Sequence, residues 1–343
     1  FKQKTAYEIS LGLVGSEMCI RDRFYGVPRY TEWDPTPLVA YSFSIFFGLM
    51  LGDVIYGILM LLVVRYVLDK LVENPESENY LTFKKMLYVS GFASIIAGFL
   101  YGSYLGDTLK LLGINIPPIV PQFTDPLSLI LLSMGIGLVH VNIAHFLGLI
   151  KALHERDKVT IASKIGLFIT EIFGIPYVLF KMANFKVFPM PDNVYNMLIY
   201  GVVVGIVFLA YSQIMSMRFF GTFMWIFDIT GLLGDIMSYT RIAGVAFATI
   251  YLASSFNLMT RMIITGFQGI LPGIAGLALG LLFGAVVFFL GHLLNLALSI
   301  IGPFIHSLRL CFVEFLPKFY EGGGIEYSPL KLVLRRRIIV KPP

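Results

Sequence analysis

Long apolar runs alternate with short polar connections along this chain, and the pattern predicts a bundle of membrane-spanning helices. The apolar runs lie at residues 37–64, 86–105, 126–150, 161–180, 194–210, 225–258 and 271–315. Most reach or exceed the length of about 18 residues that indicates a membrane span. They are also far longer than the alternating strands of about ten residues in membrane β-barrels. We therefore expect an all-α, polytopic fold whose backbone groups are satisfied within helices.

Charges in the connections predict how the helices cross. Basic residues concentrate at 65–85, at 151–164 and in the C-terminal tail, whereas the connections at 106–125, 185–193 and 259–270 hold few. Cytoplasmic loops of membrane proteins carry an excess of Lys and Arg. The alternation therefore predicts single crossings between these loops and a cytosolic C-terminus.

The first apolar run, 37–64, is interrupted by Gly52 and Asp53. The charge pattern places both of its ends on the cytosolic side, but about 28 residues rise only about 42 Å as one helix, too short to cross twice. We interpret the run as a hairpin of two short helices, with Asp53 capping the second. One tilted helix with an inverted start is the alternative.

The last two apolar runs, 225–258 and 271–315, are too long to stand upright in a membrane. Forty-five residues make about 68 Å of helix, and a hydrocarbon core is about 30 Å thick. We expect strong tilt, a break or an extension into the cytosol. Gly302 and Pro303 are the expected break in the last run.

Composition excludes several function classes. The chain is 57% hydrophobic and 14% charged, against about a quarter charged in soluble domains. Its net charge of +5 fits cytosolic loops beside anionic lipid, so we expect no nucleic-acid partner. Cys19 and Cys311 lie far apart, and no phosphate loop, metal spacing or nucleophile constellation occurs. We therefore expect no cofactor, no metal and no catalysis by this chain alone.

Domain organisation follows from the same pattern. Residues 1–23 show no periodicity and look like translated adapter sequence, so we interpret them as foreign to the protein. Residues 24–36 are expected to be a remnant of a cytosolic domain or linker, 37–316 the membrane domain, and 317–343 a cytosolic tail.

Arg241 is the most informative residue, because it lies inside an apolar run and cannot lose its proton. It needs an acidic partner, water or an ion pathway, and a structural ion pair with Asp228 or Asp235 is the alternative to a functional role. A spacing of three or four residues places Asp228, Gly231, Asp235, Ser238 and Arg241 on one helix face. Gly244 and Ala248 continue this face with small residues that permit close approach of another helix.

A second polar stripe follows the last apolar run at the same spacing. It comprises His292, Asn295, Ser299, Gly302, His306 and Arg309. A water-lined path explains such a stripe on an apolar helix, and hydrogen bonds between helices are the alternative.

Other polar residues carry weaker signals. Glu171 lies in an apolar run and is a candidate to line a half-channel or to pair with Lys164. We expect Glu314 and Lys318 to be ordinary interfacial charges. We expect Asn–His contacts between helices to account for the polar residues of the third run, His140, Asn142 and His145.

At three stretches the sequence resembles subunit I, also called subunit a, of V-type and A-type ATPases. They are the glycine-rich 47–57, the segment 233–241 that ends in Arg241, and 306–324 with its Gly322-Gly323-Gly324. The resemblance covers about residues 24–330. The family also has a long N-terminal cytosolic domain, so the chain looks like a fragment.

The resemblance implies the stator of a rotary ATPase, with about eight membrane segments and two long tilted helices against a rotor ring of proteolipid subunits. Arg241 matches the family's essential arginine and Arg309 its second arginine. Between two half-channels, Arg241 would attract the ring carboxylate in its ionised form. Central and peripheral stalk subunits and the lipid bilayer are the other implied partners, and the ion would be H⁺ or Na⁺.

One departure from the family concerns the half-channels. Eukaryotic members have a Glu where Ser299 aligns, so Asp228, Asp235 or Glu171 is expected to substitute. The half-channel candidates are Asp228, Asp235, Ser238, Glu171, His292, Asn295, Ser299 and His306. A secondary ion-coupled transporter and a structural membrane anchor are the alternative functions.

Overall fold

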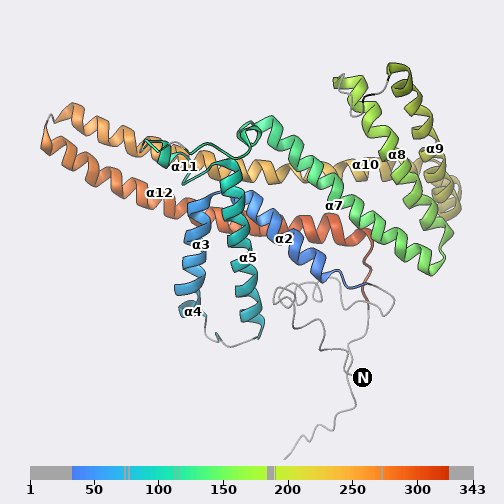
Figure 1. The fold of residues 1–343 in the computed structure, drawn as a ribbon. Coiled ribbons are helices and arrows are strands. Elements are labelled where there is room, and N and C mark those ends of the chain that lie inside the picture. Colours follow the sequence, from blue (N-terminus) through green and yellow to red (C-terminus); the bar gives the residue numbers. More distant parts are fainter. Residues whose placement is uncertain are drawn as a thin grey trace, which may run out of the picture.

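The computed structural model describes residues 33–323, apart from 73–74, 76–77, 112, 115, 184–188, 190 and 272. Nearly all of these residues lie in helices, and none of them forms a β-strand. Figure 1 shows two groups of helices joined by a long pair that runs across the molecule. The predicted all-α fold is confirmed. The segment interpreted as foreign, most of the linker and most of the tail lie outside the described residues.

The first apolar run forms two helices, α2 (Thr36–Leu51) and α3 (Val54–Tyr66), as predicted. Gly52 ends α2 with a left-handed backbone, φ 50°, which glycine adopts without steric cost. Asp53 then caps α3 by accepting hydrogen bonds of 2.9 and 3.0 Å from two backbone N–H groups of the first turn. In Figure 1 the two helices diverge from this turn.

Helix α5 (Glu78–Tyr101) packs against both α2 and α3 and joins them into one unit. The approach is close, since a Cβ added at Gly98 would lie 2.4 Å from the backbone nitrogen of Val54. The chain after α5 folds back over the break, where Ser103 Oγ and the Gly106 N–H donate to the Asp53 carboxylate at 2.7 and 3.0 Å. Asp53 therefore both caps the start of α3 and anchors the connection that follows α5.

Short elements occupy the connections around this unit. They are α4 (Leu68–Leu71), α6 (Thr108–Leu111) and η1 (Pro121–Thr124).

A second group consists of α7 (Pro126–Glu155), α8 (Lys158–Ala183) and α9 (Asp192–Met217). Helices α8 and α9 pack along most of their length. Glycines permit this contact, since a Cβ at Gly166 would lie 3.0 Å from the carbonyl oxygen of Gly205. In Figure 1 this group lies at the opposite end of the molecule from the place where α11 ends and α12 begins.

The last two apolar runs form the long pair. After η2 (Arg218–Phe220) come α10 (Gly221–Ser238) and α11 (Thr240–Ile270). Together with Tyr239, where the helix is interrupted, they span 50 residues. Helix α12 (Ile274–Arg309) returns beside α11. It continues into η3 (Leu310–Phe315), a π-helical turn, and η4 (Leu316–Lys318).

Two expectations for this pair are wrong. The connection predicted at 259–270 is helical, because its polar residues lie within α11 and the turn comes only after Ile270. The break predicted at Gly302 and Pro303 is absent, since α12 continues through Pro303. The helix pattern changes seven residues later, at Leu310, where the turn widens.

Six helices in the described part of the chain are long and apolar enough to cross a membrane. Their exposed side chains are mostly large and apolar, as lipid requires. The chain is accordingly an integral membrane protein. The total of about eight membrane segments, which counts the short α2 and α3, stays a prediction.

Candidate functional site

Arg241 lies in the first turn of α11, directly after the interruption of the helix at Tyr239. Its side chain is 26% exposed, and its Nη1 donates to Glu314 Oε1 at 3.2 Å. Its Nη2 lies 3.4 Å from Ser238 Oγ. The partner is neither of the two acids that we considered from the sequence, Asp228 and Asp235.

Arg309 ends α12 and shares the same partner. Its Nε lies 3.7 Å from Glu314 Oε1, and its side chain is 55% exposed. The two arginines singled out from the sequence are thus brought together by one carboxylate. We call Arg241, Arg309 and Glu314 the charged cluster.

Glu314 and Lys318 are not the ordinary interfacial charges that we expected. Glu314 is only 3% exposed, and Lys318 forms an ion pair with Asp235. They were missed because they lie at the predicted cytosolic end of the last apolar run, where charged residues are normally solvated. The turns η3 and η4 fold this stretch back against α7 and α10.

The other acid on the Arg241 stripe has its own partner. Asp228 Oδ2 accepts a hydrogen bond of 2.6 Å from Gln213 Nε2 of α9. The carboxylates predicted to share a face with Arg241 therefore tie α10 to its neighbours.

The first two residues of the polar stripe on α12, His292 and Asn295, belong to a hydrogen-bonded network. His292 contacts the Tyr56 hydroxyl at 2.6 Å and Asn257 Oδ1 at 2.9 Å. Asn295 Nδ2 donates to the Tyr56 hydroxyl at 2.9 Å and to the Thr249 carbonyl at 3.0 Å. We call Tyr56, Asn257, His292 and Asn295 the neutral network. Its contacts are the hydrogen bonds between helices that we left as the alternative to a water-lined path.

The later residues of the same stripe, from Ser299 to His306, differ from this network. Ser299 is fully buried and lies 3.4 Å from Asn295 Oδ1. His306 stands near Arg241 and Arg309, and its Nδ1 makes no hydrogen bond to any described residue. The stripe thus passes from satisfied groups to an unsatisfied one as it approaches the charged cluster.

Glu171 lies in the other helix group, on α8, and is 8% exposed. Of the two options for Glu171, pairing with Lys164 is wrong, because Lys164 Nζ contacts His145 Nδ1 at 3.0 Å and the Lys318 carbonyl at 3.2 Å. Glu171 Oε1 has no hydrogen-bond partner among the described residues. It is a buried acid apart from the charged cluster.

His140 and His145 contact other helices, but not through the Asn–His contacts that we expected. His145 contacts Lys164, and Asn142 Nδ2 donates to the Leu138 carbonyl of its own helix.

His140 Nδ1 lies 2.5 Å from the Tyr239 hydroxyl, and its ring stacks on Phe315 with centroids 4.0 Å apart. This packing fixes the junction of α10 and α11 against η3. Arg241 and Glu314 therefore lie beside closely packed side chains of three elements.

Glycines leave the surface near Arg241 smooth. Apart from the adjoining residues and backbone of the same helix, no described atom lies within 4 Å of the point where a Cβ would stand at Gly231, Gly234 and Gly244. The same holds for Gly302 on α12. Small residues of this kind let another membrane helix approach closely.

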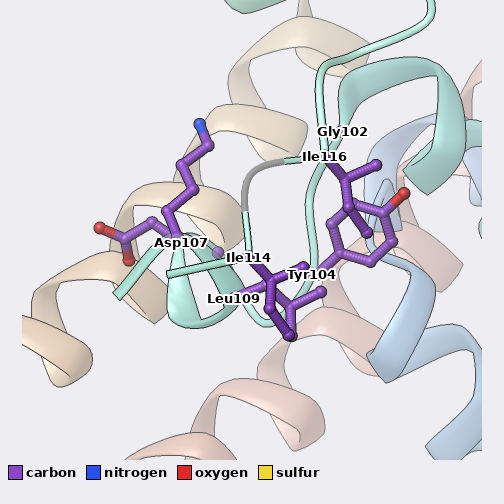
Figure 2. Close-up of a pocket in the computed structure, with 8 residues that line it drawn as sticks. Gly102, Tyr104, Asp107, Leu109, Ile114 and Ile116 are labelled. Atoms are coloured by element: carbon purple, nitrogen blue, oxygen red, sulfur yellow. The ribbon is translucent and has the colours of Figure 1, made fainter. Parts of the chain in front are cut away.

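A small hollow beside the 102–116 connection is lined mainly by apolar side chains and glycines. Figure 2 shows Tyr104, Ile114 and Ile116 among the side chains that line it, with the Asp107 carboxylate directed away from Tyr104. Asp107 accepts a hydrogen bond of 2.9 Å from Asn257. No group of His, Cys, Asp and Glu that could hold a metal occurs in the described residues.

Sequence comparisons connect the chain to a group of known proteins. Residues 20–115 match the V-type ATPase 116kDa subunit family. The A-type ATP synthase subunit I of Pyrococcus abyssi is 32% identical over 316 residues, which cover 89% of this chain and 44% of the relative. That of Pyrococcus horikoshii is 33% identical over 305 residues, with the same coverage of 89% and 44%.

A bacterial relative is also similar. The V-type ATP synthase subunit I of Borreliella burgdorferi is 25% identical over 321 residues, which cover 89% of this chain and 50% of the relative. The chain thus spans about half the length of the curated relatives it matches.

Proposed function

This chain is a homologue of subunit I of A-type and V-type ATP synthases over about nine tenths of its length, and on that premise we propose that it conducts ions in a rotary ATPase. In this proposal it is a non-catalytic stator subunit. Its long helices face a rotor ring of small membrane subunits, each with one carboxylate. H⁺ or Na⁺ crosses between the two, coupled to ATP hydrolysis or synthesis by other subunits.

The charged cluster is the observation that carries this proposal. Two guanidinium groups share one buried carboxylate, so the cluster retains a net positive charge. An uncompensated charge at membrane depth is costly and marks an ion pathway by default. A rotor carboxylate in its ionised form would supply the missing negative charge.

The surface around Arg241 supports the docking of such a rotor. Arg241 is 26% exposed, so its guanidinium remains accessible from one side. The open glycines of α10 and α11 let the rotor helix come near enough for direct contact. A fixed guanidinium nearby favours the ionised form of a carboxylate, so the ion would be released before the carboxylate passes.

We assign the access paths to the polar residues around the cluster. Asp228, Asp235, Ser238 and His306 lie on the same helix stretches as Arg241 and Arg309 and are the first candidates. His292, Asn295 and Ser299 remain candidates for the path on the side of the neutral network. Glu171 would serve only a path that runs through the α8 group.

The proposal also includes the surroundings of the chain. We place it in a prokaryotic cell membrane with a cytosolic C-terminus, together with the rotor ring and the central and peripheral stalk subunits. A secondary transporter would transport without these partners, and a structural anchor of a complex would tolerate replacement of Arg241 and Arg309.

The decisive experiment is ATP-driven ion uptake into liposomes by a complete ATPase that carries this membrane region, with Arg241 or with Arg241→Ala. We expect the variant complex to assemble and to lose uptake. Unchanged uptake by an assembled Arg241→Ala complex would make Arg241 a structural cation and contradict the proposal.

A further inference from the structure

Glu314 is a buried carboxylate with incomplete satisfaction. It is 3% exposed, and its Oε1 contacts Arg241 at 3.2 Å and Arg309 at 3.7 Å. Its Oε2 is buried and makes no hydrogen bond to any described residue. A buried carboxylate is retained at this cost only where nearby cations compensate it.

A widened turn places Glu314 in this position. Arg309 and Glu314 are five residues apart, and in an α-helix five residues point about 140° away from each other. A π-helix bonds each residue to the fifth one along, so residues five apart return to nearly the same face. The turn at η3, Leu310–Phe315, is π-helical and directs Glu314 toward both arginines. Such turns occur frequently at functional sites.

The nearby acid does not compete with Glu314 for the two arginines. The nearby acid Asp235 is paired with Lys318, so this pair adds no net charge. Glu314 is therefore the acid that offsets the two arginines within the described part of the chain.

We propose that Glu314 is a positioning residue, the internal counterion that holds Arg241 in place and reduces the net charge of the cluster. With this carboxylate present, a rotor carboxylate binds Arg241 and is released again. Without it, two uncompensated guanidinium groups hold the rotor carboxylate longer, and rotation slows. This inference rests on the function proposed above.

The test is ATP-driven ion uptake by the complete ATPase in liposomes, with Glu314→Gln, Glu314→Asp, and the double variant Arg309→Gln/Glu314→Gln. Glu321→Gln is the matched control, since Glu321 is an exposed acid that pairs with Lys151 at 3.1 Å. We expect Glu314→Gln to slow uptake at least tenfold without raising passive leak, and the control to match the unmodified complex.

The double variant separates charge from packing. Removing a positive and a negative charge together restores the net charge of the cluster, so we expect it to transport at least threefold faster than Glu314→Gln alone. Glu314→Asp, which keeps the charge, should transport faster than Glu314→Gln. A double variant no faster than the single one would overturn the proposal, as would unchanged uptake in Glu314→Gln.

Two further outcomes are informative. If Glu314→Gln fails to assemble, recovery of assembly in the double variant supports the counterion role, and no recovery overturns it. If Arg241→Ala abolishes uptake while Glu314→Gln does not affect it, the proposed function stands and only the role of Glu314 fails.

Discussion

Two polar clusters are formed by the same long helices, and they differ in charge and in completeness. In the neutral network every member bonds to another member or to the backbone, and His292 and Asn295 are almost fully buried. In the charged cluster one carboxylate serves two arginines, and Oε2 of Glu314 has no hydrogen bond within the described residues.

The difference indicates what each cluster does. A fully satisfied neutral network in an apolar bundle joins helices and specifies their register. The charged cluster has one positive charge without a counterion and one carboxylate oxygen without a hydrogen bond, so it stabilises the fold less than a complete cluster would. Such a cluster is expected where a further charged group completes it. The comparison therefore attributes stability mainly to the first cluster and supports the transport role that we propose for the second.

Among four further substitutions, replacement of Arg241 by Lys should reduce transport most. Arg241 contacts Glu314 and Ser238 with two different nitrogens, whereas Lys offers a single point charge. We expect ATP-driven uptake per assembled complex to fall roughly tenfold or more, the loss associated with one charge-assisted hydrogen bond. Arg261→Lys, an exposed position on the same helix, is the control. Near-normal uptake in Arg241→Lys would show that the shape of the guanidinium is unimportant.

Arg309→Ala should have a smaller effect. Arg309 is 55% exposed and lies 3.7 Å from Glu314, so its loss leaves the closer contact with Arg241 intact. We expect uptake to slow roughly threefold to tenfold, because one weak charge contact is worth about 1 kcal/mol. The ratio of ion uptake to ATP hydrolysis should stay the same. A fully uncoupled complex would contradict this role.

Tyr56→Phe should affect stability and not transport. The change removes the hydroxyl that contacts His292 and Asn295 and leaves their polar atoms buried. We expect a loss of about 1–3 kcal/mol, measured by thermal unfolding of the purified protein, with unchanged uptake per folded complex. Tyr251→Phe, at an exposed position of α11, is the control. Uptake that falls more than stability would instead place the neutral network on an ion path.

Ser238→Ala should have the smallest effect. Its Oγ lies 3.4 Å from Arg241, at the long end of the range for a hydrogen bond. We expect less than about a twofold change in uptake, since such a contact contributes about 0.5 kcal/mol at most. A tenfold loss in the same liposome assay would indicate that Ser238 acts directly on the ion.

The sequence predicted the parts of the site that violate a local rule. Arg241 stands out because an arginine inside an apolar run is costly. The break at Gly52 and Asp53 was predictable because a flexible residue precedes a helix-capping acid. Both signals are local, so no knowledge of the fold was needed.

Glu314 could not be predicted in the same way. It lies at the end of an apolar run, where a charge is ordinary. Its burial depends on a π-helical turn, and no residue preference predicts such a turn. Pro303 was misleading for a related reason, since an interior proline removes only one backbone hydrogen bond and neighbouring helices can stabilise the remaining turns. The partners of Asp235 and Asp228 likewise depend on tertiary packing, because Lys318 and Gln213 lie on other elements.

The long pair runs at a large angle to α3 and α5, as Figure 1 shows, and this angle has a geometric consequence. The 50 residues of α10 and α11 make a rod of about 75 Å. If this rod lies wholly within a hydrocarbon layer of about 30 Å, it gains only about 0.6 Å of depth per residue. Arg241 and Asn257 would then differ by about 10 Å in depth and about 22 Å sideways. Polar sites on such a helix are displaced laterally, so entry and exit at different depths need not lie on one vertical line.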